Sequence, residues 1–192
     1  CAAEHGLAGP YIGVAYDGTG FGTDGTAWGG EVLVAGYTRF ARVATFRPIG
    51  LAGGDVAIRQ VWRQALALLD DAFGGDAPLD RFPVFNTVGP KELAVVRAMI
   101  AGRVNCPMAH GAGRYFDAVG AIGLSRAVSG FEGQIAMEWN LAADPDEDGR
   151  YQFAVAGDRP PFELDLRPAI RSLAHELAAG TSPAAVSARF HN

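Results

Sequence analysis

The hydrophobic pattern of the first third of the chain is typical of β-strands. Residues 11–16 are rich in aromatic and β-branched side chains and lead into a glycine-rich segment at 17–30. Further strands are predicted at 31–35 and 39–46, with Gly36 in the turn between them. The chain therefore opens with a β region.

The spacing of apolar residues becomes helical after Asp55, which we expect to cap the first helix. Helices are predicted over 56–69, 91–101, 111–126, 134–141, 168–179 and 183–190, and short strands over 151–155 and 162–166. An acidic loop at 144–149 precedes these two strands, and Ser182 is expected to cap the last helix. Strands followed by helices, with short returns to strand, predict a mixed α/β domain.

The length of 192 residues fits one large domain or two small lobes. A turn-rich break beginning at Gly74 indicates a possible lobe boundary near residues 74–90. The chain starts without Met, in what resembles the end of a helix closing at Gly6, and it stops within a helical pattern. We therefore expect residues 1–192 to be an internal piece of a longer protein.

The composition excludes several classes of protein. Hydrophobic residues make up 49% and charged residues 19%, so a disordered chain is not expected. The net charge of -5 gives no basic face for nucleic acid, and no run of 18 apolar residues or signal peptide indicates a membrane or secreted protein. Two cysteines, Cys1 and Cys106, form no CxxC motif. We expect a cytoplasmic protein that binds neither nucleic acid nor membranes.

The glycine-rich segment is the first candidate for chemistry. A strand that delivers Asp17 into Gly18, Thr19 and Gly20 leaves backbone N–H groups and a hydroxyl facing one point. Such a loop can hold a phosphate, with Asp17 beside it on a hydrated Mg²⁺. The alternative is a β-hairpin in which Asp17 and Asp24 only cap turns, and the residues leave both interpretations open.

The second candidate is Asp117, which lies one turn into the helix predicted at 111–126, among small residues. A carboxylate is costly to bury there without a partner, and ribose hydroxyls would serve as partners. The alternative, slightly favoured by the residues alone, is a surface pair with Arg114 three positions earlier.

The third candidate is the pair Gln134 and Glu138, which share one helical face and could bind a sugar or a base edge. A solvated helical face is the alternative. The four histidines have no metal-ligand spacing, and surface or capping roles are expected for them: His5, His110, His175 and His191. Cys106 is expected to pack rather than react.

Taken together, these segments resemble the C-terminal Kae1-like region of the HypF family of hydrogenase maturation factors. The resemblance runs over the whole chain and is carried by residues 3–7, 17–31, 113–119 and 131–138. The string DGTGxGxDGxxWGGE at 17–31 is specific to HypF and to the related antibiotic O-carbamoyltransferases. The other segments are shared more loosely with the tRNA threonylcarbamoyl-transfer enzyme Kae1.

The resemblance implies a mixed α/β fold of the actin/Hsp70/sugar-kinase type, incomplete at both ends. It also implies a multidomain enzyme that makes a carbamoyl-adenylate from carbamoyl phosphate and ATP. In such enzymes the Kae1-like domain passes the carbamoyl group to the C-terminal Cys of HypE. The product is then dehydrated to a thiocyanate, the precursor of the cyanide ligands of nickel–iron hydrogenase.

Residue by residue, the resemblance implies catalytic roles for Asp17, Gly18 and Thr19 on the phosphate side, with Gly20 beside them. It implies a ribose contact for Asp117 and nucleoside contacts for Gln134 and Glu138. Asp17 is expected to bind a divalent metal whose other ligands lie outside these residues, so this piece alone is expected to be inactive.

Two other functions stay open at the level of sequence. One is an O-carbamoyltransferase acting on a small-molecule hydroxyl, which the flanking domains would distinguish. The other is a non-catalytic module that binds nucleotide or docks HypE. Retention of Asp17, Asp117 and Glu138 argues against a pure scaffold.

Overall fold

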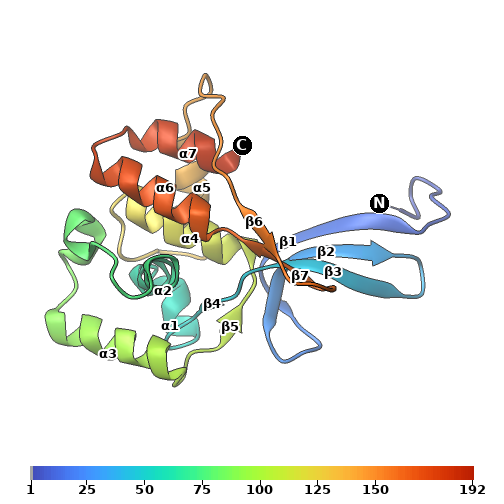
Figure 1. Cartoon of the computed structure of the whole chain (residues 1–192), viewed down its shortest axis with the longest axis horizontal. Coiled ribbons are helices and arrows are strands. Elements are labelled where there is room, and N and C mark those ends of the chain that lie inside the picture. Colours follow the sequence, from blue (N-terminus) through green and yellow to red (C-terminus); the bar gives the residue numbers. More distant parts are fainter. Residues whose placement is uncertain (1) are drawn as a thin grey trace.

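Three long antiparallel strands project as an arm from a body of helices (Figure 1). In this computed structural model, which describes residues 2–192, the arm consists of β1 (Tyr11–Phe21), β2 (Ala27–Ala35) and β3 (Phe40–Phe46). β2 is the middle strand and pairs with β1 on one side and β3 on the other. The predicted strands are confirmed, but β1 and β2 also continue into the glycine-rich segment.

One face of the arm is apolar and open to solvent. Ile12, Val14 and Tyr16 alternate along β1 and are exposed by 74%, 59% and 65%. β1 pairs with β2 alone among the strands of residues 2–192, so its other edge carries no strand partner there.

The remaining strands extend the sheet at the base of the arm. Within the described residues the sheet has seven strands in the order β4-β5-β2-β3-β7-β6, with β1 added on β2. The short strands are β4 (Ile49–Gly50), β5 (Met108–Ala109), β6 (Ala154–Ala156) and β7 (Phe162–Asp165). β7 lies parallel to β3 and antiparallel to β6. The strand predicted at 151–155 is wrong in its first half, because pairing with β7 begins only at Ala154.

The helices form a body at the base of the arm (Figure 1). They are α1 (Asp55–Arg59), α2 (Trp62–Phe73), α3 (Pro90–Gly102), α4 (Ala112–Gly123), α5 (Gln134–Leu141), α6 (Arg167–Ala178) and α7 (Pro183–His191). Two short 3₁₀ turns, η1 (Leu79–Arg81) and η2 (Pro83–Phe85), connect α2 to α3. The predicted cap of the last helix is confirmed, since Ser182 Oγ accepts the Ala184 N–H.

The single helix predicted at 56–69 is wrong, because the structure divides it at Gln60 and Val61. A distant segment makes hydrogen bonds at this junction: the Trp62 N–H donates to the Ala127 carbonyl, and the Ser129 N–H donates to the Arg59 carbonyl. Asp55 is not the cap, since Gly54 holds the N-cap position and Asp55 is the first helical residue.

The core lies where α2 meets α4 and α6, and where α4 meets α5. Leu66 and Leu69 of α2 are fully buried, as are Val119 of α4 and Trp139 of α5. Side chains from before and after residues 74–90 belong to this one cluster. The lobe boundary near 74–90 stays a prediction.

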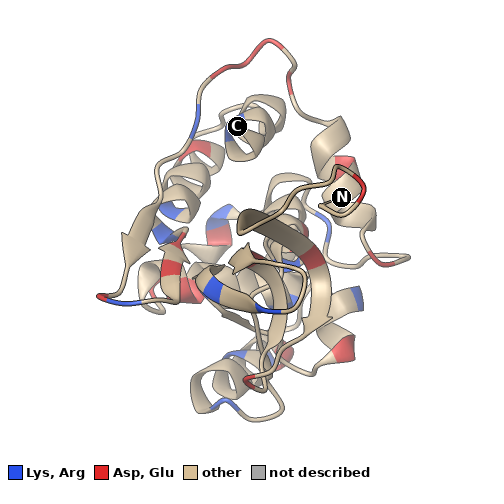
Figure 2. Cartoon of the chain, turned by 90° about the vertical axis from the view of Figure 1, so that its right-hand side faces the viewer, with Lys and Arg blue, Asp and Glu red and all other residues tan. Residues whose placement is uncertain are grey.

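Charges of both signs are spread over the arm and the helices (Figure 2). None of the helices within residues 2–192 combines the length and the apolar character that crossing a bilayer requires.

The arm joins the helical body through a contact between two backbones. A Cβ placed on Gly111, just before α4, would lie 2.1 Å from the carbonyl oxygen of Gly18 in β1. On β2, Gly29 has a φ of +144°, and a Cβ there would lie 2.6 Å from the carbonyl oxygen of Asp17. Both positions therefore require glycine, one for space and the other for space and backbone angle.

This contact predicts the effect of a single methyl group. Gly111→Ala should lower the free energy of unfolding by about 1–3 kcal/mol more than Gly89→Ala, because the added methyl overlaps the Gly18 carbonyl. Gly89 is a matched control: both glycines precede a helix with similar extended backbone angles, and a Cβ on Gly89 meets nothing within 4 Å. Urea unfolding of the two variants measures the difference, and equal losses would contradict the contact.

Candidate functional site

β1 carries a bulge at Asp17, Gly18 and Thr19. The pairing of β1 with β2 shifts between Tyr16 and Gly20, so that three residues of β1 face the single residue Gly29 of β2. The segment is thus a β-hairpin, and Asp17 and Thr19 of its bulge are exposed to solvent; the choice between turn capping and phosphate binding for Asp17 stays open. Bulges of this kind re-aim side chains and are frequent beside functional sites.

The bulge rests on the N-terminal end of α4, through the contact between Gly18 and Gly111. The first turn of a helix presents backbone N–H groups and a partial positive charge, which together favour anions. Asp17 Oδ1 accepts the N–H of Gly18 at 2.7 Å. The arrangement can place an anionic ligand beside the bulge, at the first turn of α4.

Glu31, on β2, holds the opposite side of the bulge. Its buried carboxylate accepts the N–H groups of Gly29 and Gly30 at 2.6 and 2.7 Å. The other oxygen of this carboxylate accepts hydrogen bonds from Arg42 at 2.7 Å and from the hydroxyl of Thr45 at 3.0 Å. A buried charge that is paired in this way is stable and fixes the backbone around it.

Asp24 closes the hairpin turn, as the capping interpretation predicted. One of its oxygens accepts the N–H and the hydroxyl of Thr26 and the indole N–H of Trp28, and the other is paired with Arg42 at 2.7 Å. Burial opposes ionisation of this carboxyl, but the hydrogen bonds from Thr26 and Trp28 and the charge of Arg42 outweigh it and hold the pKa of Asp24 well below its usual range. Asp24 is therefore a structural anion of the turn.

Asp117 pairs with Arg114, as the alternative interpretation had it, but the pair is buried rather than at the surface. The two residues are 2% and 1% exposed, with Arg114 Nη2 3.0 Å from Asp117 Oδ2. Burial raises the pKa of Asp117 to about 6, against the lowering effects of Arg114 and of the Ala136 N–H. Contact between Asp117 and a ribose stays a prediction, and it requires the carboxylate to leave these partners.

The loop at 129–133, which precedes α5, lies beside the bulge. Thr19 and Glu132 line one cavity of about 450 Å³, together with α1 residues and the exposed ring of Phe131. Glu132 Oε1 lies 3.6 Å from Arg114 Nη2, and the side chain of Glu132 is 67% exposed. Glu132 is thus the exposed carboxylate beside the bulge.

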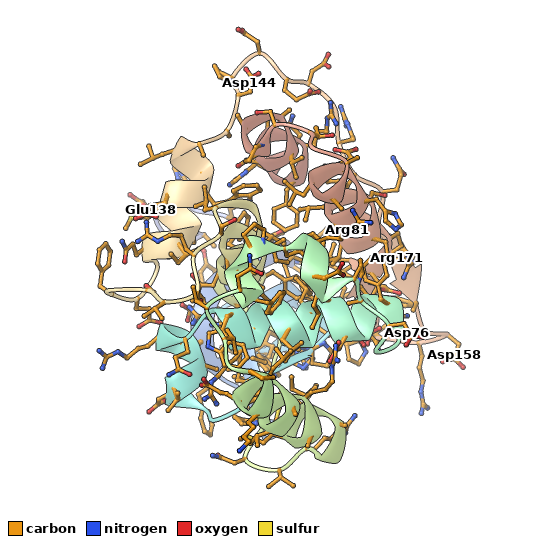
Figure 3. The ribbon with its side chains drawn as sticks, turned by 90° about the vertical axis from the view of Figure 1, so that its left-hand side faces the viewer. Asp76, Arg81, Glu138, Asp144, Asp158 and Arg171 are labelled. Atoms are coloured by element: carbon orange, nitrogen blue, oxygen red, sulfur yellow. The ribbon has the colours of Figure 1, made fainter. Side chains whose placement is uncertain are left out.

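Gln134 and Glu138 share a face of α5, as predicted, and they bind each other. The Gln134 amide donates to Glu138 at 2.7 Å and accepts the Gly130 N–H at 2.7 Å, while Glu138 pairs with Arg126 at 3.3 Å. Figure 3 shows Glu138 on α5 near the outer edge of the molecule. In this arrangement the pair anchors the loop at 129–133, and its nucleoside contact stays a prediction.

The expectation of a surface or capping role is wrong for His110, which is buried between the strands and α4. Its Nδ1 lies 2.6 Å from the carbonyl oxygen of Phe46, which assigns the proton to that nitrogen. Cys106 is buried, and the expectation that it packs is confirmed. Cys1 lies outside the described residues.

A metal site is not formed by residues 2–192 alone. Within that range no group of three or more His, Cys, Asp or Glu side chains converges in a way that could hold an ion. Asp17 is exposed and could supply one ligand at most, so its metal role stays a prediction and no chemical step is derived from a metal.

The structure thus brings three of the predicted segments together around Gly18: the bulge, α4 and the loop before α5. Three residues of this region were not predicted from the sequence: Glu31 and Arg42, which hold the bulge, and Glu132, which faces the cavity. Arg114 was expected only as the partner of Asp117 in the surface alternative. The sequence contains one feature that could have indicated the buried network around Glu31, namely that this charged residue directly follows two glycines.

The class of domain follows from a family model that matches residues 13–192 and is described as "Carbamoyltransferase, Kae1-like Domain, second subdomain". Curated relatives include the carbamoyltransferases HypF of Rhizobium leguminosarum bv. viciae, 38% identical, and of Synechocystis sp., 33% identical; they cover 91% and 99% of this chain. The chain belongs to the HypF family of carbamoyltransferases.

Solved HypF structures agree with this assignment. Full-length HypF in its phosphate- and nucleotide-bound form matches the whole chain with a TM-score of 0.89 at 33% identity. HypF of T. kodakarensis matches 97% of the chain with a TM-score of 0.78 at 27% identity. The expected mixed α/β fold of the Kae1-like, actin/Hsp70/sugar-kinase type is confirmed. The chain spans about a quarter of each of these two structures, and 22% and 26% of the two curated relatives.

The buried carboxyl of Asp117 predicts a pH dependence of stability. Its folded pKa of about 6 lies above the ordinary value of 3.8, so the folded chain binds the proton more tightly than the unfolded chain does. The stability from this group is complete below about pH 4 and is lost as pH rises through about 6. Relative to Asp117→Asn, the free energy of unfolding of the unsubstituted protein should fall by about 2 kcal/mol from pH 4 to pH 7. Urea titrations across this range measure it, and a flat difference would contradict the raised pKa.

Proposed function

We propose that this chain is the part of a HypF-type enzyme that transfers a carbamoyl group from a carbamoyl-adenylate to the C-terminal Cys of HypE. The adenylate is made from carbamoyl phosphate and ATP, and the product serves cyanide-ligand synthesis for nickel–iron hydrogenase. Membership of the HypF family supports the reaction class. All the relatives described above are named HypF, which favours HypE over a small-molecule acceptor. We place the reaction in the cytoplasm.

The observation that carries the proposal is the bulge seated on the N-terminal end of α4. Gly18 meets Gly111 there, so the bulge lies directly beside the positive end of a helix, whose first N–H groups favour an anion. The hydroxyl of Thr19 and the carboxylate of Asp17 project from the same turn into solvent. A nucleoside phosphate is the kind of anion that such a site accepts.

The reaction does not require the protein to form a covalent bond with the substrate. In the transfer, the thiolate sulfur forms a bond to the carbamoyl carbon while the bond from that carbon to the phosphate oxygen breaks, and AMP leaves with the electron pair. The thiol proton passes to solvent. An adenylate is already activated, so positioning and stabilisation of the departing phosphate are the main needs. The Thr19 hydroxyl and the first N–H groups of α4 would donate to that phosphate.

The nucleoside end would lie toward the cavity between Thr19 and the loop at 129–133. The ring of Phe131 is exposed on that side, and Glu132 offers an exposed carboxylate to sugar hydroxyls. Asp117 would act indirectly, through its ion pair with Arg114, unless nucleotide binding exposes its carboxylate to the ribose. Gln134 and Glu138 would keep the loop in place.

Two activities measured on the full-length protein test the proposal. Asp17→Ala combined with Thr19→Ala should lower carbamoyl transfer to HypE on the order of 100-fold, because the phosphate loses the Thr19 hydroxyl and the bulge loses the carboxylate that accepts the Gly18 N–H. Carbamoyl-phosphate-dependent exchange of labelled pyrophosphate into ATP should survive, since the adenylate would form elsewhere in the enzyme.

Asp80→Ala is the matched control, because this carboxylate is 81% exposed and lies in the turn-rich break far along the chain from the bulge. It should leave both activities unchanged. If the bulge variant retains both activities, the region is a scaffold and the catalytic proposal is wrong.

A further inference from the structure

Arg114 occupies an unfavourable place for a cation. It is the third residue of α4, where the helix dipole favours negative charge, and it is 1% exposed. Burying a guanidinium costs free energy unless its donors are paired. A hydrophobic side chain of similar size would fill this position at lower cost.

The pairing of Arg114 is incomplete. Its Nη2 lies 3.0 Å from Asp117 and 3.6 Å from Glu132. Its Nε and Nη1 are buried and make no hydrogen bond to any residue between 2 and 192. The ion pair with Asp117 therefore accounts for one arm of the guanidinium and leaves the rest unexplained.

The same guanidinium touches the bulge. A Cβ built on Gly18 would lie 2.9 Å from Arg114 Nη2, so this nitrogen packs directly against the backbone of the bulge. Nη2 thus meets three segments that are far apart in the sequence: β1 at Gly18, α4 at Asp117 and the loop at Glu132. No substitution of Gly18 leaves this contact intact.

We propose that Arg114 is a positioning residue for the phosphate end of the nucleotide site. Its Nη2 contacts the backbone of Gly18 and the carboxylate of Asp117 at the same time, and so it sets the direction in which the bulge presents Thr19. Its fixed positive charge lies directly behind the bulge, where it strengthens the attraction for a phosphate. This inference rests on the proposed function.

A role of Arg114 at the phosphate end should affect binding of the phosphate and not of the nucleoside. In the full-length protein, isothermal titration with AMP and with adenosine measures the two parts. The binding event that belongs to this region is the one that Asp17→Ala with Thr19→Ala weakens for AMP. Arg114→Gln should weaken AMP at that event about tenfold and leave adenosine unchanged, because only AMP carries the phosphate.

Arg114→Lys keeps the charge but lacks the planar fork, so it should recover part of the AMP affinity. Arg97→Gln is the matched control, because it removes one partner of the Arg97–Asp70 ion pair on α3 and α2, away from the bulge. It should change neither affinity. Thermal unfolding of each variant shows whether it is folded.

Three outcomes overturn the inference. Equal losses of AMP and adenosine affinity in Arg114→Gln would show a purely structural residue, and unchanged affinities would show no role. If Arg114→Gln does not fold, Arg114→Lys is measured instead. A ratio of AMP affinity to adenosine affinity equal to that of the unsubstituted protein would then contradict the proposal. If no binding event responds to the bulge variant, the proposed function fails as well, which distinguishes the two failures.

Discussion

The contact between the backbones of Gly18 and Gly111 is the constraint on which the rest of the structure depends. It brings a bulge in β1 against the start of α4, two segments separated by about half of the chain, with no room for a side chain between them. Glu31 accepts the N–H groups of Gly29 and Gly30 in β2, opposite the bulge, and so stabilises the bulge against regular strand pairing. A site made of backbone groups is rigid and small, and its geometry does not depend on rotamers.

Elements with local causes were predictable. The strands of the arm, α3 and α5 follow from periods of two and 3.6 residues in their own sequences. The break between α1 and α2 was not predictable, because it depends on hydrogen bonds with Ala127 and Ser129, which come from a distant part of the chain. The late start of β6 likewise depends on how far β7 extends beside it. Tertiary hydrogen bonds, rather than propensity, decided these boundaries.

The candidate site shows the same division. The glycine pattern indicated Asp17 and Thr19, and their exposure at a bulge agrees with a role toward a ligand. The burial of Asp117 could not be read from its own helix, because it results from α5 packing over α4 and from the bulge closing the end. Arg114 was visible only as a pairing partner three residues away. Its contact with Gly18 exists only after the sheet and the helices have met.

The open face and edge of β1 have a consequence for the chain on its own. A strand that exposes Ile12, Val14 and Tyr16, and whose outer edge meets no strand within residues 2–192, is a template for strand addition by another molecule. Two such arms brought together would join edge to edge before their helical bodies met, since the arm stands apart from the body (Figure 1). Concentration, rather than temperature, would then limit how long the isolated chain stays in solution, and a single lysine on that face would extend the limit.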